Sequence, residues 1–151
     1  MAPVSRVTLV TRLPVSASTV YALLTDPAHV RCWWAGPGGR VVNAQIDARD
    51  HGLFWIAAVP DGGLGRSDYG CFTSVIPNEL IEADWNHDPN CTSRLVIQLV
   101  PLGKETEISL NHRDLPDAAT REIMETQWRA ALAALSAYAA TCAADDAEQG
   151  G

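Results

Sequence analysis

Apolar and polar residues alternate over residues 4–13, VSRVTLVTRL, which is the pattern of a half-buried β-strand. Two short helices are predicted to follow this strand. Ser16 can cap the first helix, and Asp26, with a proline directly after it, can cap the second. The chain therefore begins with one strand and two short helices, and the second helix runs into the adjacent Trp33 and Trp34.

The middle of the chain predicts six more strands, separated by short segments rich in Gly, Pro, Asp and Asn. Because connections this short join neighbouring antiparallel strands, the pattern predicts a meander. The six runs cover residues 40–47, 53–60, 69–76, 79–87, 93–101 and 105–113.

A long amphipathic helix is predicted over about residues 117–142, where apolar residues recur every three or four positions. No other predicted element is long enough to cover the apolar face of a seven-stranded sheet. We therefore expect an α+β fold in which a curled antiparallel sheet grips this helix, with a cavity at the open end that the two short helices close. The apolar stripe consists of Ile123 or Met124, Trp128, Ala131 or Leu132, Leu135 and Tyr138.

Length and charge limit the classes of function. A chain of 151 residues with 47% apolar residues predicts one domain, residues 1–142, and an acidic tail, 143–151, that we expect to be solvated and mobile. The net charge is −7, so the chain lacks a basic stripe for nucleic acid or for an anionic membrane. The N-terminal residues lack the apolar core of a secretory signal, which favours a cytoplasmic protein. The oligomeric state is left open.

The cysteines show no C-x-x-C spacing and no histidine at zinc-ligand distance, so they are predicted to be free thiols. The glycine-rich loops AGPGG and PDGGLG lack the Lys-Ser/Thr pair of a phosphate-binding loop and are predicted to be turns. We therefore expect no metal, no cofactor and no catalytic residue. The four cysteines are Cys32, Cys71, Cys91 and Cys142.

Strand alternation places two histidines on the inner face of the sheet. In LIEADWNHD, His87 shares a face with Trp85, and in TEISLNHR, His112 shares a face with Ile108 and Leu110. The two histidines lie on strands with one strand between them, which separates them by about 9 to 10 Å. A shared metal ion would need both nitrogens within about 2 Å. Structural histidines bonded to the backbone are therefore favoured over metal ligands.

Alternation is less informative on two other strands. In VVNAQIDA it places Val42, Ala44 and Ile46 on one face and Asp47 on the other. The run over residues 53–60 is apolar on both faces, so either Phe54 or Trp55 can face the core.

The two adjacent tryptophans cannot both face one core. We expect Trp33 to pack beneath a lid formed by residues 26–39 and Trp34 to face the cavity mouth, although the reverse assignment stays open. The predicted function is the binding of a small, largely apolar molecule in the cavity. The predicted ligand-binding residues are Trp34, Trp85, His87, His112, Met124, Trp128 and Leu132.

An ordered set of residues over positions 4–140 resembles the START-like (SRPBCC, helix-grip) superfamily. Within that superfamily the chain is most similar to the branch named after activators of the ATPase of the ninety-kilodalton heat-shock chaperone. Two positions depart from the branch: His51-Gly52 replaces a frequent glycine pair, and Gln127-Trp128 replaces a frequent Gly-Trp. The set comprises Asp26-Pro27, Trp33-Trp34 with Pro37-Gly38, DARDHG at 47–52, Gly70, Pro77, Trp85, Thr92-Ser93, Thr106, His112 and Trp128.

The resemblance implies a helix-grip fold and leaves three functions to compare. The first is the ligand binding already predicted. The second is a protein-interaction module that contacts a chaperone or another protein. The third is an enzyme of the cyclase or dehydratase type, in which His87, His112 or Asp47 would act as acid or base.

Overall fold

Seven strands form one antiparallel sheet in the computed structural model, which describes residues 5–88 and 91–149 and omits the side chains of residues 87, 88, 91 and 145–149. The strands lie in the order β1-β7-β6-β5-β4-β3-β2. The elements are β1 (Val7–Leu13), α1 (Ala17–Thr25), α2 (Pro27–Val30), β2 (Arg40–Ile46), β3 (Leu53–Val59), β4 (Arg66–Ile76), β5 (Leu80–Asp88), β6 (Cys91–Leu102), β7 (Glu105–Arg113) and α3 (Ala118–Gln149).

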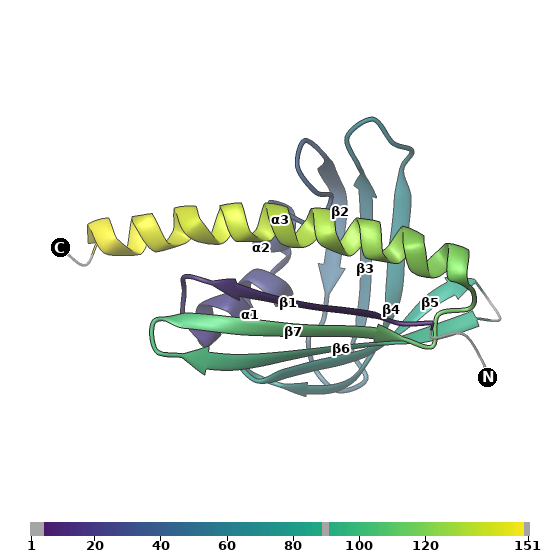
Figure 1. Cartoon of the computed structure of the whole chain (residues 1–151), viewed down its shortest axis with the longest axis horizontal. Helices are drawn as coiled ribbons and strands as arrows, with labels where there is room; N and C mark the ends of the chain where they lie inside the picture. The colour runs from purple at the N-terminus through teal and green to yellow at the C-terminus, as the bar shows by residue number, and fades with distance from the viewer. Residues whose placement is uncertain (1–4, 89–90, 150–151) are drawn as a thin grey trace.

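The sheet is strongly curled, and the long helix α3 lies along its concave side (Figure 1). In this view β1, β7 and β6 run along the helix, whereas β2, β3 and β4 turn to run across it. Strands β2 to β7 form the predicted meander, and β1 pairs with β7 through the register Leu9↔Leu110. The α+β helix-grip fold is confirmed. None of the helices described is long and apolar enough to cross a membrane.

The helix starts follow the capping signals in the sequence. The Ser16 side chain accepts a hydrogen bond from the backbone N–H of Thr19 at 3.3 Å, and Asp26 Oδ1 accepts one from Ala28 at 2.9 Å. Asp117 Oδ1 accepts the N–H of Thr120 at 2.7 Å at the start of α3. Each cap satisfies an N–H group that has no partner within its helix, which is worth about 1 kcal/mol.

Helix α3 continues beyond the point at which the apolar stripe predicts its end. The helix reaches Gln149 rather than Cys142. Its C-terminal part extends past the strands in Figure 1, where no sheet is available to bury an apolar face. The residues expected to form an acidic tail therefore continue the helix as far as Gln149.

Strand β2 differs from the alternation that was predicted. Its register with β3 shifts between Val41 and Asn43, because Val42 is an extra residue with no partner. Val42 is 53% exposed, whereas Val41 packs against the core and Ala44 is buried. A bulge inserts one residue and so reverses the side-chain alternation on one side of it. The prediction that Val42 shares the inner face with Ala44 was therefore wrong.

Three choices that the sequence left open, one on β3 and two on α3, are decided by packing. Phe54 is buried in the core, and Trp55 lies on the opposite face of β3. On α3, Met124 is buried and Ile123 is 56% exposed, whereas Ala131 and Leu132 are both buried. The indole of Trp128 is almost fully buried between α3 and the sheet.

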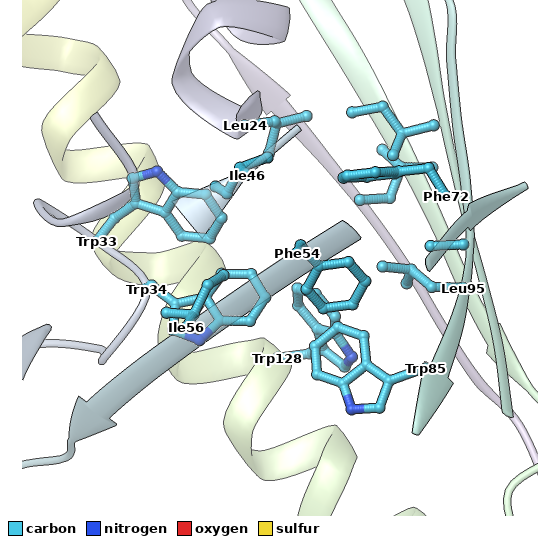
Figure 2. Close-up of a pocket in the computed structure, with 13 residues that line it drawn as sticks. Leu24, Trp33, Trp34, Ile46, Phe54, Ile56, Phe72, Trp85, Leu95 and Trp128 are labelled. Atoms are coloured by element: carbon cyan, nitrogen blue, oxygen red, sulfur yellow. The ribbon is translucent and has the colours of Figure 1, made fainter. Parts of the chain in front are cut away.

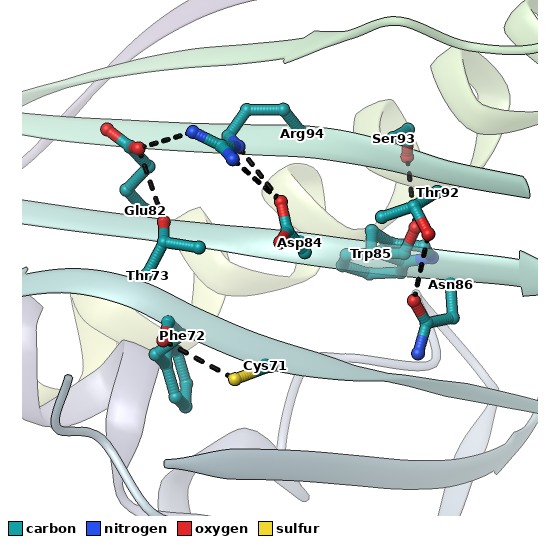
Figure 3. Close-up of polar contacts among 10 residues, drawn as sticks. All are labelled: Cys71, Phe72, Thr73, Glu82, Asp84, Trp85, Asn86, Thr92, Ser93 and Arg94. Atoms are coloured by element: carbon teal, nitrogen blue, oxygen red, sulfur yellow. Dashed lines mark hydrogen bonds and ion pairs between the residues drawn. The ribbon is translucent and has the colours of Figure 1, made fainter. Parts of the chain in front are cut away.

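The opposite face of the sheet carries polar side chains, as expected for a sheet that is buried on one side. Arg94 on β6 pairs with Glu82 at 2.7 Å and with Asp84 at 2.9 Å, both on β5 (Figure 3). The hydroxyl of Thr73 on β4 donates to the same Glu82 carboxylate at 3.2 Å. These contacts join three neighbouring strands outside the core.

Candidate ligand cavity

An apolar cavity of about 50 Å³ lies between the concave face of the sheet, helix α3 and the segment that follows α2. Figure 2 shows its walls, on which the indole nitrogens of the tryptophans are the polar atoms. A space of this size with apolar walls favours a small hydrophobic molecule over water. The lining residues are Leu24, Trp33, Trp34, Ile46, Phe54, Ile56, Phe72, Ile81, Ala83, Trp85, Leu95, Ile97 and Trp128.

Trp34 forms one boundary of the cavity with a half-buried indole ring. The ring stacks on Trp85 with centroids 5.7 Å apart and an interplanar angle of 17°. It meets Trp128 edge-on, at 5.5 Å and 80°. Its N–H donates a hydrogen bond to Asp68 Oδ2 at 3.1 Å. Trp34 is therefore held on its face, on its edge and at its nitrogen.

Asp68 on β4, the residue that accepts the Trp34 hydrogen bond, is only 7% exposed. Its Oδ2 accepts a second hydrogen bond from Arg66 Nε at 3.3 Å, and the positive guanidinium compensates the buried negative charge. A recess of about 10 Å³, close to the room needed for one water molecule, lies beside this pair. Gln127 and Met124 on α3 also line the recess.

Trp33 is held more firmly than Trp34. Its side chain is 2% exposed, and its N–H donates to the backbone oxygen of Leu23 at 2.8 Å. The structure thus places Trp33 in the core and Trp34 at the boundary, the arrangement the sequence favoured. Trp33 also lines the cavity, so it is both a packing and a wall residue. Movement of residues 26–39 as a lid stays a prediction.

The segment that carries the two tryptophans is also joined to α3. His29 Nδ1 and the hydroxyl of Tyr138 lie 2.8 Å apart, with ring centroids separated by 5.8 Å. Burial, followed by the Cys32 and Cys142 thiols, raises the pKa of Tyr138 to about 12. The tyrosine is therefore neutral at physiological pH and connects α2 with α3 through a hydrogen bond.

His112 is completely buried, but it lies behind the cavity wall rather than in it. Its Nδ1 accepts the indole N–H of Trp128 at 3.0 Å, and its Nε2 lies 2.6 Å from the hydroxyl of Ser93. An indole nitrogen is always a donor, so Nδ1 carries no proton and the ring is the neutral tautomer protonated at Nε2. His112 therefore orients Trp128. His112 is not among the residues that line the cavity, and its predicted part in ligand binding stays a prediction.

The other predicted site residues have different positions. Trp85 and Trp128 line the cavity, and Met124 lines the neighbouring recess. Leu132 is buried in the core but is not part of either lining. The side chain of His87 lies outside the described residues, and the register between β5 and β6 shifts beside it, so alternation from Trp85 no longer applies there.

Sequence reasoning missed Asp68 and Arg66, together with much of the apolar wall. Both residues fall between the predicted loop PDGGLG and the predicted strand over residues 69–76, whereas β4 already begins at Arg66. No local signal distinguishes a buried aspartate from a turn aspartate in such a segment. Among the described residues, no group of three or more His, Cys, Asp or Glu side chains is arranged to hold a metal ion.

A curled seven-stranded sheet on a long C-terminal helix, with an apolar cavity between them, defines a START-like helix-grip protein. The sequence profile of the family described as Activator of Hsp90 ATPase homolog 1-like protein matches residues 14–140. The chain belongs to this family. A comparison with curated proteins finds no match.

Several solved structures share the fold. An AHSA1 protein from Silicibacter pomeroyi has a TM-score of 0.79 at 24% identity, over 90% of this chain and 98% of that one. A protein from Chromobacterium violaceum has a TM-score of 0.79 at 23% identity, over 89% and 96%. An AHSA1-like protein from Aeromonas hydrophila has a TM-score of 0.77 at 15% identity, over 91% and 93%. At these identities the likeness establishes the architecture.

Proposed function

We propose that the protein binds a small, largely apolar molecule in the cavity between the sheet and α3. The observation that carries this proposal is the apolar wall, which is contributed by the sheet, α3 and the Trp33-Trp34 segment. Residues 1–142 would act as one binding domain in the cytoplasm, without a cofactor. Binding is favoured over catalysis because the one carboxylate beside the cavity boundary, among the described lining residues, is paired with Arg66.

The volume of the cavity limits what the observed state can hold. About 50 Å³ is well below the 300 to 1,000 Å³ typical of pockets for drug-sized ligands. A ligand of more than a few heavy atoms therefore requires a side chain at the boundary to move. Trp34 is the candidate, because it is only half-buried and lies in a turn rather than in a strand or helix. The structure described is accordingly the closed state in this proposal.

A neutral fluorescent probe, N-phenyl-1-naphthylamine, tests the proposal directly. We expect saturable binding that Ala83→Val weakens severalfold, because Ala83 is a fully buried lining residue and the added methyl groups occupy the cavity. Ala57→Val is the matched control, since it makes the same change on β3, on the opposite face of the sheet. Circular dichroism must show that both variants are folded. Equal probe affinity in the two variants would contradict binding in this cavity.

A second candidate function, contact with a chaperone, has a separate observation in its favour. Trp55, Tyr69 and Leu53 lie on the convex face of the sheet, 38%, 39% and 67% exposed, around a shallow groove of about 630 Å³. The family description names the ATPase of Hsp90, so purified Hsp90 is the partner to test. In this alternative, Trp55→Ser abolishes Hsp90 binding in calorimetry and Trp34→Ala does not. Binding that is absent, or unaffected by Trp55→Ser, would count against it.

A further inference from the structure

We infer that the cavity accepts a planar, uncharged aromatic molecule with a ring N–H or a ring-bound O–H, which takes the place of the Trp34 indole and donates its hydrogen bond to Asp68. This inference rests on the proposed binding function and names the chemical class of the ligand. The observation behind it is that the Trp34 side chain is held in the way that an aromatic ligand would be held.

The site of the Trp34 ring has the three parts of an aromatic binding slot. Trp85 on β5 supplies a parallel face at 5.7 Å, and Trp128 on α3 supplies a perpendicular wall at 5.5 Å. Asp68 on β4 supplies an acceptor 3.1 Å from the ring nitrogen. Stacked and edge-to-face contacts are the arrangements that aromatic rings favour. The three parts come from three different elements, and none of them belongs to the segment that carries Trp34.

Each part of the slot is also held by contacts other than those to Trp34. Trp85 packs against Phe54 with centroids 5.5 Å apart. Trp128 donates to His112 at 3.0 Å, which fixes the plane of its indole. Asp68 is bonded to Arg66. Departure of the Trp34 ring would therefore leave a preformed slot, and a preformed site loses little free energy to ordering when a ligand enters.

Trp34 itself can leave with little disruption of the fold. It lies in the turn between α2 and β2, and Gly36 and Gly38 follow it with φ of 80° and 77°, a backbone conformation that glycine adopts readily. Its neighbour Trp33 stays anchored to Leu23 through the indole N–H. Rotation of the Trp34 side chain therefore breaks its hydrogen bond to Asp68 and its ring contacts with Trp85 and Trp128, while the segment remains attached.

The charges around the slot select the ligand class. The Asp68 carboxylate accepts hydrogen bonds, so a ligand must donate to it, and a carboxylate or phosphate on the ligand would be repelled. Arg66 already compensates the charge of Asp68, so the slot does not require a cationic amine. A neutral ring donor, such as the N–H of an indole or the O–H of a phenol, fits both conditions.

Indole and indene test the inference, because indene has nearly the same shape and lacks the N–H. In Trp34→Ala, which leaves the slot open, we expect indole to bind about tenfold more tightly than indene, as a hydrogen bond to a charged group predicts. Adding Asp68→Leu should remove this preference while indene still binds. Trp55→Ala is the matched control, since it removes an exposed tryptophan from the opposite face.

The wild-type protein provides a second measurement that does not depend on the folding of a variant. In ¹H–¹⁵N spectra, addition of indole should shift the side-chain N–H signal of Trp34 strongly and leave that of Trp33 in place. Equal affinity for indole and indene, or indole binding without a change at Trp34, would overturn the inference while leaving the binding function intact. If neither compound binds to any variant, both this inference and the proposed function fail.

Discussion

Replacing Trp128 with phenylalanine would separate the hydrogen bond of this residue from its packing. The indole N–H donates to His112 Nδ1 at 3.0 Å, and both side chains are buried. Phenylalanine keeps an aromatic ring in the core but removes the donor, so the buried His112 Nδ1 loses this hydrogen bond. The substitution therefore removes one identified hydrogen bond and keeps most of the ring packing.

The expected magnitude follows from two contributions. A buried acceptor left without a partner costs about 1 to 3 kcal/mol. The smaller ring loses contacts with Trp34 and Trp85, which lie 5.5 and 5.6 Å away, and adds about 1 kcal/mol. Trp128→Phe should thus lower the free energy of unfolding by about 2 to 4 kcal/mol, at least half of the 3 to 5 kcal/mol expected for Trp128→Ala.

Urea denaturation, followed by circular dichroism, measures these differences. In a His112→Phe background, Trp128→Phe should cost only its packing contribution, so the double-mutant cycle should give a coupling of about 1 to 3 kcal/mol. Trp55→Phe is the control at an exposed site and should cost less than about 0.5 kcal/mol. If Trp128→Phe is no more destabilising than Trp55→Phe, the buried hydrogen bond does not stabilise the fold and the reasoning is refuted.

Three other predictions follow from the same core. Trp33→Ala should lower the free energy of unfolding by about 3 to 5 kcal/mol and Trp34→Ala by about 1 to 2 kcal/mol, since only Trp33 is fully buried. Equal losses in urea denaturation would contradict this difference. Gly70→Ala should cost about 1 to 3 kcal/mol, because the new Cβ would meet the Phe54 ring at 2.8 Å and the Asp84 carbonyl oxygen, and thermal denaturation tests it. The pKa of Tyr138 is raised from 10.0, the value in an unfolded chain, to about 12 in the folded protein. The unfolded state therefore loses this proton first, and stability should fall between about pH 10 and pH 12. Tyr138→Phe should lack that part of the decrease in alkaline urea denaturation.

Much of the fold could be predicted because its signals are local. Ser16 and Asp26 accept N–H groups from residues two or three positions away, so their capping roles depend only on nearby sequence. The strands of the meander are bounded by turn residues, and the apolar stripe of α3 repeats along one helix. Predicting these features required no knowledge of which strands become neighbours. The resemblance to the family indicated how the elements are arranged.

The candidate site could be predicted only in part. Alternation correctly placed Trp85 and His112 on the inner face, and helical spacing placed Trp128 there. The sequence could not show that His112 lies behind Trp128 rather than beside the cavity, because that depends on how closely α3 approaches β7. Asp68 carried no signal at all, since its burial results from contact with a tryptophan 34 positions earlier.

The sequence by itself determined where the helices begin, which runs form strands and which face of α3 is apolar, because hydrophobic periodicity and capping act over a few residues. The tertiary structure decided which face Val42 takes, whether Phe54 or Trp55 is buried, and which polar group meets Trp34. Each of these depends on an element distant in sequence: a bulge against β3, a glycine on β4 beneath the Phe54 ring, and a carboxylate on β4 beside the turn that carries Trp34. At such points the orientation of a side chain is set by the packing of two elements against each other. The local sequence pattern describes only one of these two packed surfaces.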